Sequence, residues 1–438
     1  MKKWIGRIFK GIGILLLAGI IGVVAWRMLY GRSWSKDVAW ATRDLPYTGA
    51  VQDGVLDHEE IAIHYAPQID QAVNVLLSAG GRGDFITAVN YDGDWSCLNN
   101  WENLTKGDLG AAVYYSVQET DTHYYVGYYF YHPRDDAEIW LDRHENDMEG
   151  VMLAIPKSTE GFAAPEYMYT QGHGNVYFYL DGEVLPDSRR GGALTLFEGS
   201  GRPHLYITPN GTLQNCGHSV EAAGEHSTYW SVGDSGVRYV YGGSANKPLF
   251  WNGPFENNPC AYELRPLSEL WAFRNGPYDG TGVFGSYGAF DGDNFGEDKA
   301  NPPWAWRNKN IYGFGGSFLT DPAWTINHAV SGANLSSDYI VNPWAEWRIS
   351  EIHTIIPRTV DASQVTLHLI RDGWEFSNPA WFTLAEESAG IYGVTVSGQE
   401  SLWVAAPENT TWRFEVRDAQ GKLLTICAVG FDAEFRAE

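Results

Sequence analysis

The chain has 438 residues, of which 44% are hydrophobic and 14% aromatic, and its formal net charge at pH 7 is −24. This length and apolar content allow real hydrophobic cores in two or three domains. The acidic excess argues against a nucleic-acid partner because it repels phosphate groups.

The first thirty residues have the pattern of a membrane segment. Four basic residues between positions 2 and 10 precede the uncharged run Gly11–Trp26. We expect a cytoplasmic N-terminus at residues 1–10 and a signal-anchor transmembrane helix at residues 11–30, so that the chain's own membrane is a partner. The bulk of the chain would then be extracytoplasmic, at the cell surface or in the periplasm. Cleavage after Val23-Val24-Ala25, as in a signal peptide, remains the alternative.

After a polar stalk at residues 37–57, short apolar runs alternate with turn residues. Ile61–Tyr65 and Phe85–Tyr91 are expected strands, and Ala112–Val117 with His123–Tyr131 is an expected hairpin. Apart from the anchor, only Ile69–Leu77 has helical periodicity. The pattern predicts an all-β chain, with an antiparallel β-sandwich in the domain at residues 58–345.

The second half of the chain changes character twice. Residues 252–345 are rich in Gly, Pro, Asn and Trp, and we expect a long irregular aromatic-rich extension packed on the sandwich. Residues 346–438 contain six short apolar runs and predict a second, smaller C-terminal β-sandwich. The aromatic residues of the chain either pack in strand cores or line a carbohydrate or headgroup site, and the first interpretation is favoured.

The four cysteines have no C-x-x-C spacing, so a zinc–thiolate site is not predicted. In an exported domain one or two disulfides can form, and Cys216–Cys260 is the first pair to expect. Sequence alone does not fix the pairing.

Four side chains of metal-ligand type lie within fifteen residues, between an aromatic run and an apolar run. They are Asp135, His144, Asp147 and Glu149. If Asp147 and Glu149 begin a strand, their spacing directs both carboxylates to one face, while His144 folds back from the connection. Such a set suits Mg²⁺, Ca²⁺ or Mn²⁺, and Zn²⁺ less well. An exposed acidic turn, with His144 paired to Glu145 or Asp142, is equally compatible with the spacing.

The stretches Tyr131-His132-Pro133-Arg134-Asp135, His144–Glu149 with its His-x-x-Asp-x-Glu pattern, and His173-Gly174 together resemble the necrosis- and ethylene-inducing-like proteins. A related His-x-x-Asp-x-Glu signature occurs in a vacuolar-sorting-related family of plants and fungi. The resemblance covers roughly residues 59–250. It implies a β-sandwich that holds a divalent cation at its rim through Asp135, His144, Asp147 and Glu149, with His173 beside the ion.

Some members of that family recognise sugar headgroups of membrane lipids and are cytolytic. This chain departs from the toxins, because Arg143, Glu145, Asn146 and Met148 stand where the family heptad has Gly, Arg, His and Trp. The departures favour metal binding over toxicity. They leave the four expected ligand positions intact.

We expect a cation-dependent module that recognises glycans or lipid headgroups rather than an enzyme. A metal-dependent hydrolase is the first alternative. In it His173, whose neighbours Gly172 and Gly174 allow close backbone approach, would act as acid and base. His218 is a weaker candidate for a site residue. A structural envelope protein without catalysis is the remaining alternative.

Overall fold

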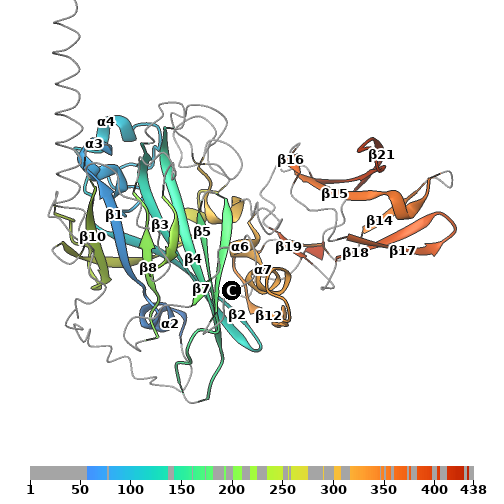
Figure 1. The fold of residues 1–438 in the computed structure, drawn as a ribbon, viewed down its shortest axis with the longest axis horizontal. Coiled ribbons are helices and arrows are strands. Elements are labelled where there is room, and N and C mark those ends of the chain that lie inside the picture. The colour runs from blue at the N-terminus through green and yellow to red at the C-terminus, as the bar shows by residue number, and fades with distance from the viewer. Residues whose placement is uncertain are drawn as a thin grey trace, which may run out of the picture.

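The computed structural model describes residues 57–75, 78–136, 143–159, 161–172, 174–180, 192–193, 201–209, 218–223, 234–249, 255, 258–274, 290, 300–306, 316–345, 347–349, 352–356, 360–371, 374–375, 382–396, 402–404, 412–428 and 432–433. Within these ranges the chain is mostly β, with short helices and turns between the strands (Figure 1).

One large sheet dominates the first part of the chain. Its strands are β1 (Gln68–Asn74), β2 (Ala112–Thr120), β3 (His123–Asp135), β4 (His144–Pro156), β5 (Tyr167–Gly172), β6 (Asn175–Leu180), β7 (Gly192–Ala193), β8 (His204–Ile207), β9 (Val220–Ala222), β10 (Asp234–Tyr241), β11 (Pro259–Pro266) and β12 (Tyr339–Val341). The strand order is β7-β6-β5-β4-β3-β2-β11-β10-β1-β8-β9, and β12 pairs with β2 outside this path.

The large sheet is mixed. The hairpins from β2 to β6 are antiparallel, whereas β11 runs parallel to both β2 and β10, and β1 runs parallel to β8. The sheet also curls toward itself, because an isolated bridge joins Gly172 at the end of β5 to Ser219 just before β9. Strand β9, at one end of the order, therefore returns to β5, near the other end.

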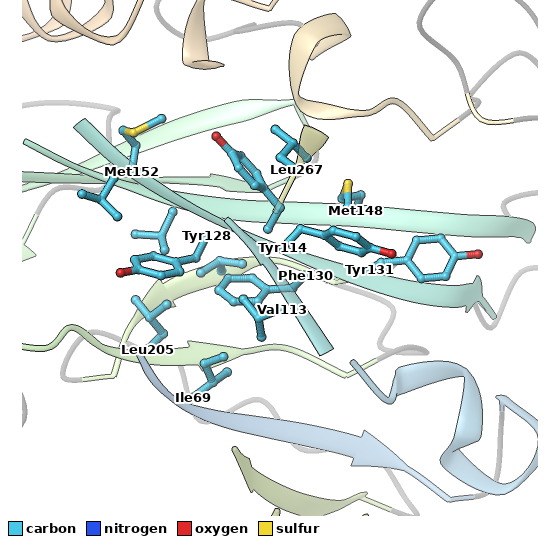
Figure 2. Packing of buried hydrophobic residues seen from close by; sticks show 14 of the residues in the cluster. Ile69, Val113, Tyr114, Tyr128, Phe130, Tyr131, Met148, Met152, Leu205 and Leu267 are labelled. Atoms are coloured by element: carbon cyan, nitrogen blue, oxygen red, sulfur yellow. The ribbon is translucent and has the colours of Figure 1, made fainter. Parts of the chain in front are cut away.

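Aromatic side chains fill the interior of this part. Figure 2 shows Tyr114, Tyr128, Phe130 and Tyr131 packed among aliphatic residues and Met148, and all of these side chains are almost fully buried. The helices and turns of the same part are α2 (His58–His64), α3 (Ser78–Gly81), η1 (Arg82–Asp84), α4 (Asn100–Asn103), α5 (Ser268–Trp271), η4 (Pro303–Ala305), α6 (Ser317–Thr320) and α7 (Pro322–Ala329). The buried aromatic residues of this part thus pack in strand cores, which is the favoured interpretation of the aromatic content.

Three small sheets and the turn η5 (Ala362–Gln364) make up the C-terminal part. The strands are β13 (Trp347–Ile349), β14 (Ile352–Ile355), β15 (Thr366–Arg371), β16 (Trp374–Glu375), β17 (Phe382–Ser388), β18 (Ile391–Val396), β19 (Leu402–Val404), β20 (Trp412–Arg417), β21 (Leu423–Ala428) and β22 (Asp432–Ala433). Sheets β14-β18-β17 and β16-β15-β20-β21 share one apolar cluster, which also takes in Trp324 of α7. Neighbours of Trp324 on α7, Ala323 and Ile326, belong instead to the core of the large sheet.

The predicted fold class is wrong on two points. The large sheet is one curled, mixed sheet rather than an antiparallel sandwich, and β11, from the stretch expected to be an irregular extension, lies inside it. In addition, no helix of the described residues is long and apolar enough to cross a membrane. The expected transmembrane segment at residues 11–30 lies outside those residues, as do the N-terminus at 1–10 and the stalk up to residue 56.

Three local predictions also need correction. Residues 61–64 belong to helix α2, which Asp57 caps by accepting a hydrogen bond from the backbone of Glu60, instead of forming a strand. The segment 69–74, expected to be helical, is part of strand β1, and residues 85–91 form turns rather than a strand. Cys260 is a free, buried thiol that donates to the carbonyl of Asn246, so the expected Cys216–Cys260 disulfide is absent.

Candidate functional site

The β3–β4 hairpin places Asp135 directly opposite His144 at the end where β3 leads into β4. Two further register pairs follow along the hairpin, His132 with Asp147 and Phe130 with Glu149. The Nε2 atom of His144 lies 3.4 Å from Asp135 Oδ2. Both side chains are largely buried, so the pair is sheltered from bulk water.

The other ring nitrogen of His144 has a backbone partner. Nδ1 lies 2.7 Å from the carbonyl oxygen of Asn146 and 3.2 Å from that of Glu145. A carbonyl can only accept, so Nδ1 carries a hydrogen and donates it. Burial opposes a charge on this ring, but the hydrogen bond and charge of Asp135, together with the charge of Asp147, outweigh it and raise the pKa of His144 to about 9.

Asp147 belongs to a buried chain of alternating acidic and imidazole groups. Its Oδ2 lies 2.8 Å from Nδ1 of His218, and the Nε2 of His218 lies 3.1 Å from Asp84 Oδ1. Burial disfavours the charged forms of His218 and Asp147, but their hydrogen bonds and opposite charges outweigh that cost. They raise the pKa of His218 to about 10 and hold the pKa of Asp147 well below its ordinary value.

Parts of the chain distant in sequence bring these groups together. Asp84 ends the turn η1, and its Oδ2 accepts from the backbone of Asn74 at the end of β1. His218 directly precedes Ser219, which the isolated bridge ties to Gly172. His132 of β3 stacks on His218 with ring centroids 3.7 Å apart, and burial followed by the nearby His218 charge lowers its pKa well below the ordinary value.

Glu149 lies two residues further along β4 and is also buried, at 4% exposure. Its carboxylate contacts the side-chain amide of Gln171 on β5 when that amide is oriented to donate, and the Gln171 oxygen then accepts from the backbone of Gly174 at 3.1 Å. Gln171 thus holds Glu149 from the neighbouring strand.

An aromatic and a basic side chain flank the hairpin where β3 leads into β4. The guanidinium of Arg134 lies 3.7 Å from the ring centroid of Trp101, and its Nη2 donates to Asp136 Oδ1 at 2.6 Å. The backbone N–H of Trp101 donates to Glu145 Oε1 at 2.8 Å. Trp101 is partly exposed. These contacts attach α4 to the rim of the site.

The structure therefore brings Asp135 and His144 into contact and places Asp147 within their electrostatic reach, while Glu149 is held by Gln171. No group of three or more His, Cys, Asp or Glu side chains among the described residues is arranged to hold a metal ion. His173, the expected acid–base residue, lies outside those residues.

Sequence reasoning missed Asp84 and His132 and undervalued His218. Asp84 belongs to a tripeptide that resembles a surface turn, and His132 was one histidine among several in an aromatic run. Hairpin register places His132 opposite Asp147, whereas Asp84 reaches Asp147 only through His218, which the curl of the sheet brings in. The only local signal was the position of His218 after Cys216-Gly217.

No protein-family model matches the chain, and no curated protein matches its sequence. Solved structures do match. One described as a toxin fold for microbial attack and plant defense has 12% identity and a TM-score of 0.29, over 52% of this chain and 86% of its own. A complex of NLPPya with glucosamine has 13% identity and a TM-score of 0.27, over 41% and 72%. Necrosis and Ethylene inducing Protein 2, from the causal agent of cocoa's Witches Broom disease, has 12% identity and a TM-score of 0.24, over 39% and 71%. The solved structures similar to this chain are thus of the necrosis- and ethylene-inducing toxin fold, at low identity and low TM-score.

Proposed function

We propose that this chain binds a divalent cation near the end of the β3–β4 hairpin where β3 leads into β4, through Asp135, His144, Asp147 and Glu149. In this proposal the loaded site recognises a glycan or a glycosylated lipid headgroup outside the cytoplasm. The carboxylate-rich donor set favours Mg²⁺, Ca²⁺ or Mn²⁺ over Zn²⁺.

The observation that carries the proposal is that Asp135 is buried with one carboxylate oxygen that has no described hydrogen-bond partner. Its carboxylate is 4% exposed, and in the described part of the chain its Oδ1 has no hydrogen-bond partner. Burying a carboxylate oxygen without a donor or an ion costs several kcal/mol. A cation beside Asp135 would remove that cost. The nearest second ligand for such a cation is Nε2 of His144, which lies 3.4 Å from the same carboxylate.

The second support is the orientation of His144. Histidines that ligate metals commonly donate their other ring N–H to a carbonyl or carboxylate, which fixes the tautomer. In His144 the Nδ1–H donates to the carbonyl of Asn146, so a neutral ring presents the lone pair of Nε2 toward Asp135. In the absence of an ion, the carboxylates of Asp135 and Asp147 stabilise a proton on Nε2 of His144. Binding of an ion would therefore displace that proton.

Loading also requires side chains to move, since the described groups are not arranged around an ion as they stand. Asp147 keeps Oδ2 on His218 and has Oδ1 to offer, and Glu149 would turn away from Gln171. Both lie on β4, three and five residues beyond His144, and in this proposal their side chains rotate toward the Asp135–His144 pair.

Recognition of a sugar is supported by the surroundings of the hairpin end. Trp101 is partly exposed beside Arg134 and Glu145, and indole rings stack on the apolar faces of sugars. A cation bound to the neighbouring carboxylates would coordinate hydroxyl oxygens of the same sugar. The two features together give a site for a polyhydroxylated ligand.

Thermal unfolding with and without cations tests the binding step. After treatment with a chelator, the wild type should be stabilised by Mg²⁺, Ca²⁺ or Mn²⁺, because an ion at about 100 times its dissociation constant adds about 2.7 kcal/mol to the free energy of unfolding. Asp135→Asn and Glu149→Ala should lose this stabilisation. Asp121→Asn, at the exposed turn on the other end of β3, is the matched control and should keep it.

Glycan arrays and vesicles carrying glycosylated lipids test the recognition step. Retention should require the cation and should fall in Asp135→Asn but not in Asp121→Asn. A wild type that is stabilised by none of Mg²⁺, Ca²⁺, Mn²⁺ and Zn²⁺ would refute the proposal as a whole. Stabilisation without any cation-dependent retention would refute the recognition step alone.

A further inference from the structure

We propose that Asn146 is a positioning residue of the candidate cation site, whose left-handed backbone and buried amide together set the orientation of the His144 ring. This inference rests on the proposed cation site and names a residue outside its four ligands. It concerns binding geometry and assigns Asn146 no contact with the ion.

The backbone of Asn146 is unusual for its place in a strand. Its φ is +62°, and Ala79 is the only other non-glycine residue of the described ranges with a positive φ. Asn tolerates this left-handed region better than most residues, because its short polar side chain can form hydrogen bonds locally. A left-handed residue interrupts the regular alternation of side chains along β4, between His144 and Asp147.

The peptide that follows this residue has a specific partner. The carbonyl oxygen of Asn146 lies 2.7 Å from Nδ1 of His144, so the chain turns back far enough for residue 144 to donate to residue 146. That hydrogen bond directs the opposite edge of the ring, Nε2, to Asp135 at 3.4 Å. The direction of this carbonyl, the nearer of the two that Nδ1 meets, therefore helps to determine which nitrogen His144 presents.

The side chain of Asn146 anchors the residue, and with it the carbonyl, through buried hydrogen bonds. Its amide is fully buried, with Oδ1 accepting from Tyr131 Oη at 2.6 Å and from Asn100 Nδ2 at 3.0 Å, while Nδ2 donates to the carbonyl of Cys97 at 3.2 Å. Asn100 also donates to the carbonyl of Pro133, so the same network joins both strands of the hairpin next to Asp135. Every described polar atom of the Asn146 side chain is engaged away from the site.

The Tyr131→Phe variant isolates this role with little risk to folding. It removes one hydroxyl, which donates to Asn146 and accepts from Asn100 of the same network, and keeps the ring in the core. Tyr129→Phe is the matched control, since Tyr129 is equally buried, lies two residues earlier on β3, and bonds Ser116 Oγ at 2.8 Å instead. Asn146→Gly removes the whole amide and still permits a positive φ. Asn342→Gly is its control, because it loses an amide hydrogen bond to Thr320 far from the hairpin end.

The dissociation constant of Mn²⁺ is the decisive readout, measured on the folded proteins by electron paramagnetic resonance of free Mn²⁺. Asn146→Gly should weaken Mn²⁺ binding by about 10- to 100-fold, the usual effect of removing a group that orients a metal ligand. Tyr131→Phe should weaken it less, and Tyr129→Phe and Asn342→Gly should bind as the wild type does. The melting temperatures without cation report the structural cost separately.

The outcomes separate the two proposals. If the wild type binds Mn²⁺ and Tyr131→Phe and any folded Asn146→Gly bind equally well, the positioning role is refuted and the cation site stands. If the wild type binds no cation, both fail. If Tyr131→Phe and Tyr129→Phe weaken binding to the same extent, the effect is general softening of the core and the positioning role is again refuted.

Discussion

Gly172 and Ser219 form the bridge at which the curled sheet meets itself. A Cβ atom on residue 172 would lie 3.0 Å from the Cβ of Ser219, 3.2 Å from its Cα, and closer still to its Oγ. The backbones approach this closely only because residue 172 has no side chain. The same contact places His218, one residue earlier, against Asp147 on β4.

Gly172→Ala should therefore loosen the closure of the sheet. We expect a loss of about 1–3 kcal/mol in the free energy of unfolding, the usual cost of forcing extra atoms into a packed contact. Chemical denaturation followed by tryptophan fluorescence measures it. Ser219→Gly removes the Cβ and Oγ that would collide, so the double variant should recover part of the loss. A Gly172→Ala protein as stable as the wild type would contradict this account of the bridge.

His218→Asn should be strongly destabilising. It removes the imidazole that separates two buried carboxylates, and removal of one partner from a buried ionic group typically costs about 3–5 kcal/mol. His123→Asn is the control, because the Glu166 carboxylate that His123 contacts is half exposed. That pair should contribute less than about 1 kcal/mol. Equal effects of the two substitutions in chemical denaturation would argue against the buried Asp84–His218–Asp147 chain.

The free energy of unfolding should depend on pH in the way that the raised pKa of His218 dictates. His218 has an ordinary pKa of 6.5 in the unfolded chain and about 10 in the folded protein, so the folded state keeps a proton that the unfolded state releases. Its contribution is complete below pH 6.5 and is lost as the pH rises toward 10. His144, with its pKa raised to about 9, acts in the same direction.

Unfolding free energies measured between pH 6 and pH 10 test this directly. The wild type should lose stability steadily across the range, and His218→Asn should lose it with a smaller slope because the contribution of His218 is then missing while that of His144 remains. Identical slopes in the two proteins would mean that His218 does not hold its proton in the folded state.

Local patterns predicted much of the strand content. The hairpin expected from Ala112–Val117 and His123–Tyr131 corresponds to β2 and β3. These segments alternate or concentrate β-branched and aromatic residues between clear turn signals, so their local preference agrees with the final structure. Ile61–Tyr65 misled because the capping Asp57 and acidic first turn of α2 outweighed its apolar alternation.

The sequence by itself determined that four ligand-type side chains lie at one end of a β-hairpin, because a strand pair fixes which residues face each other. Hairpin register alone places Asp135 opposite His144. Only the tertiary structure decided what holds Asp147, since Asp84 and His218 reach it through a curled sheet whose strand order no local pattern encodes. The parallel insertion of β11 and the close approach at Gly172 depend on contacts between distant segments, and such contacts are settled by the packing of the whole core.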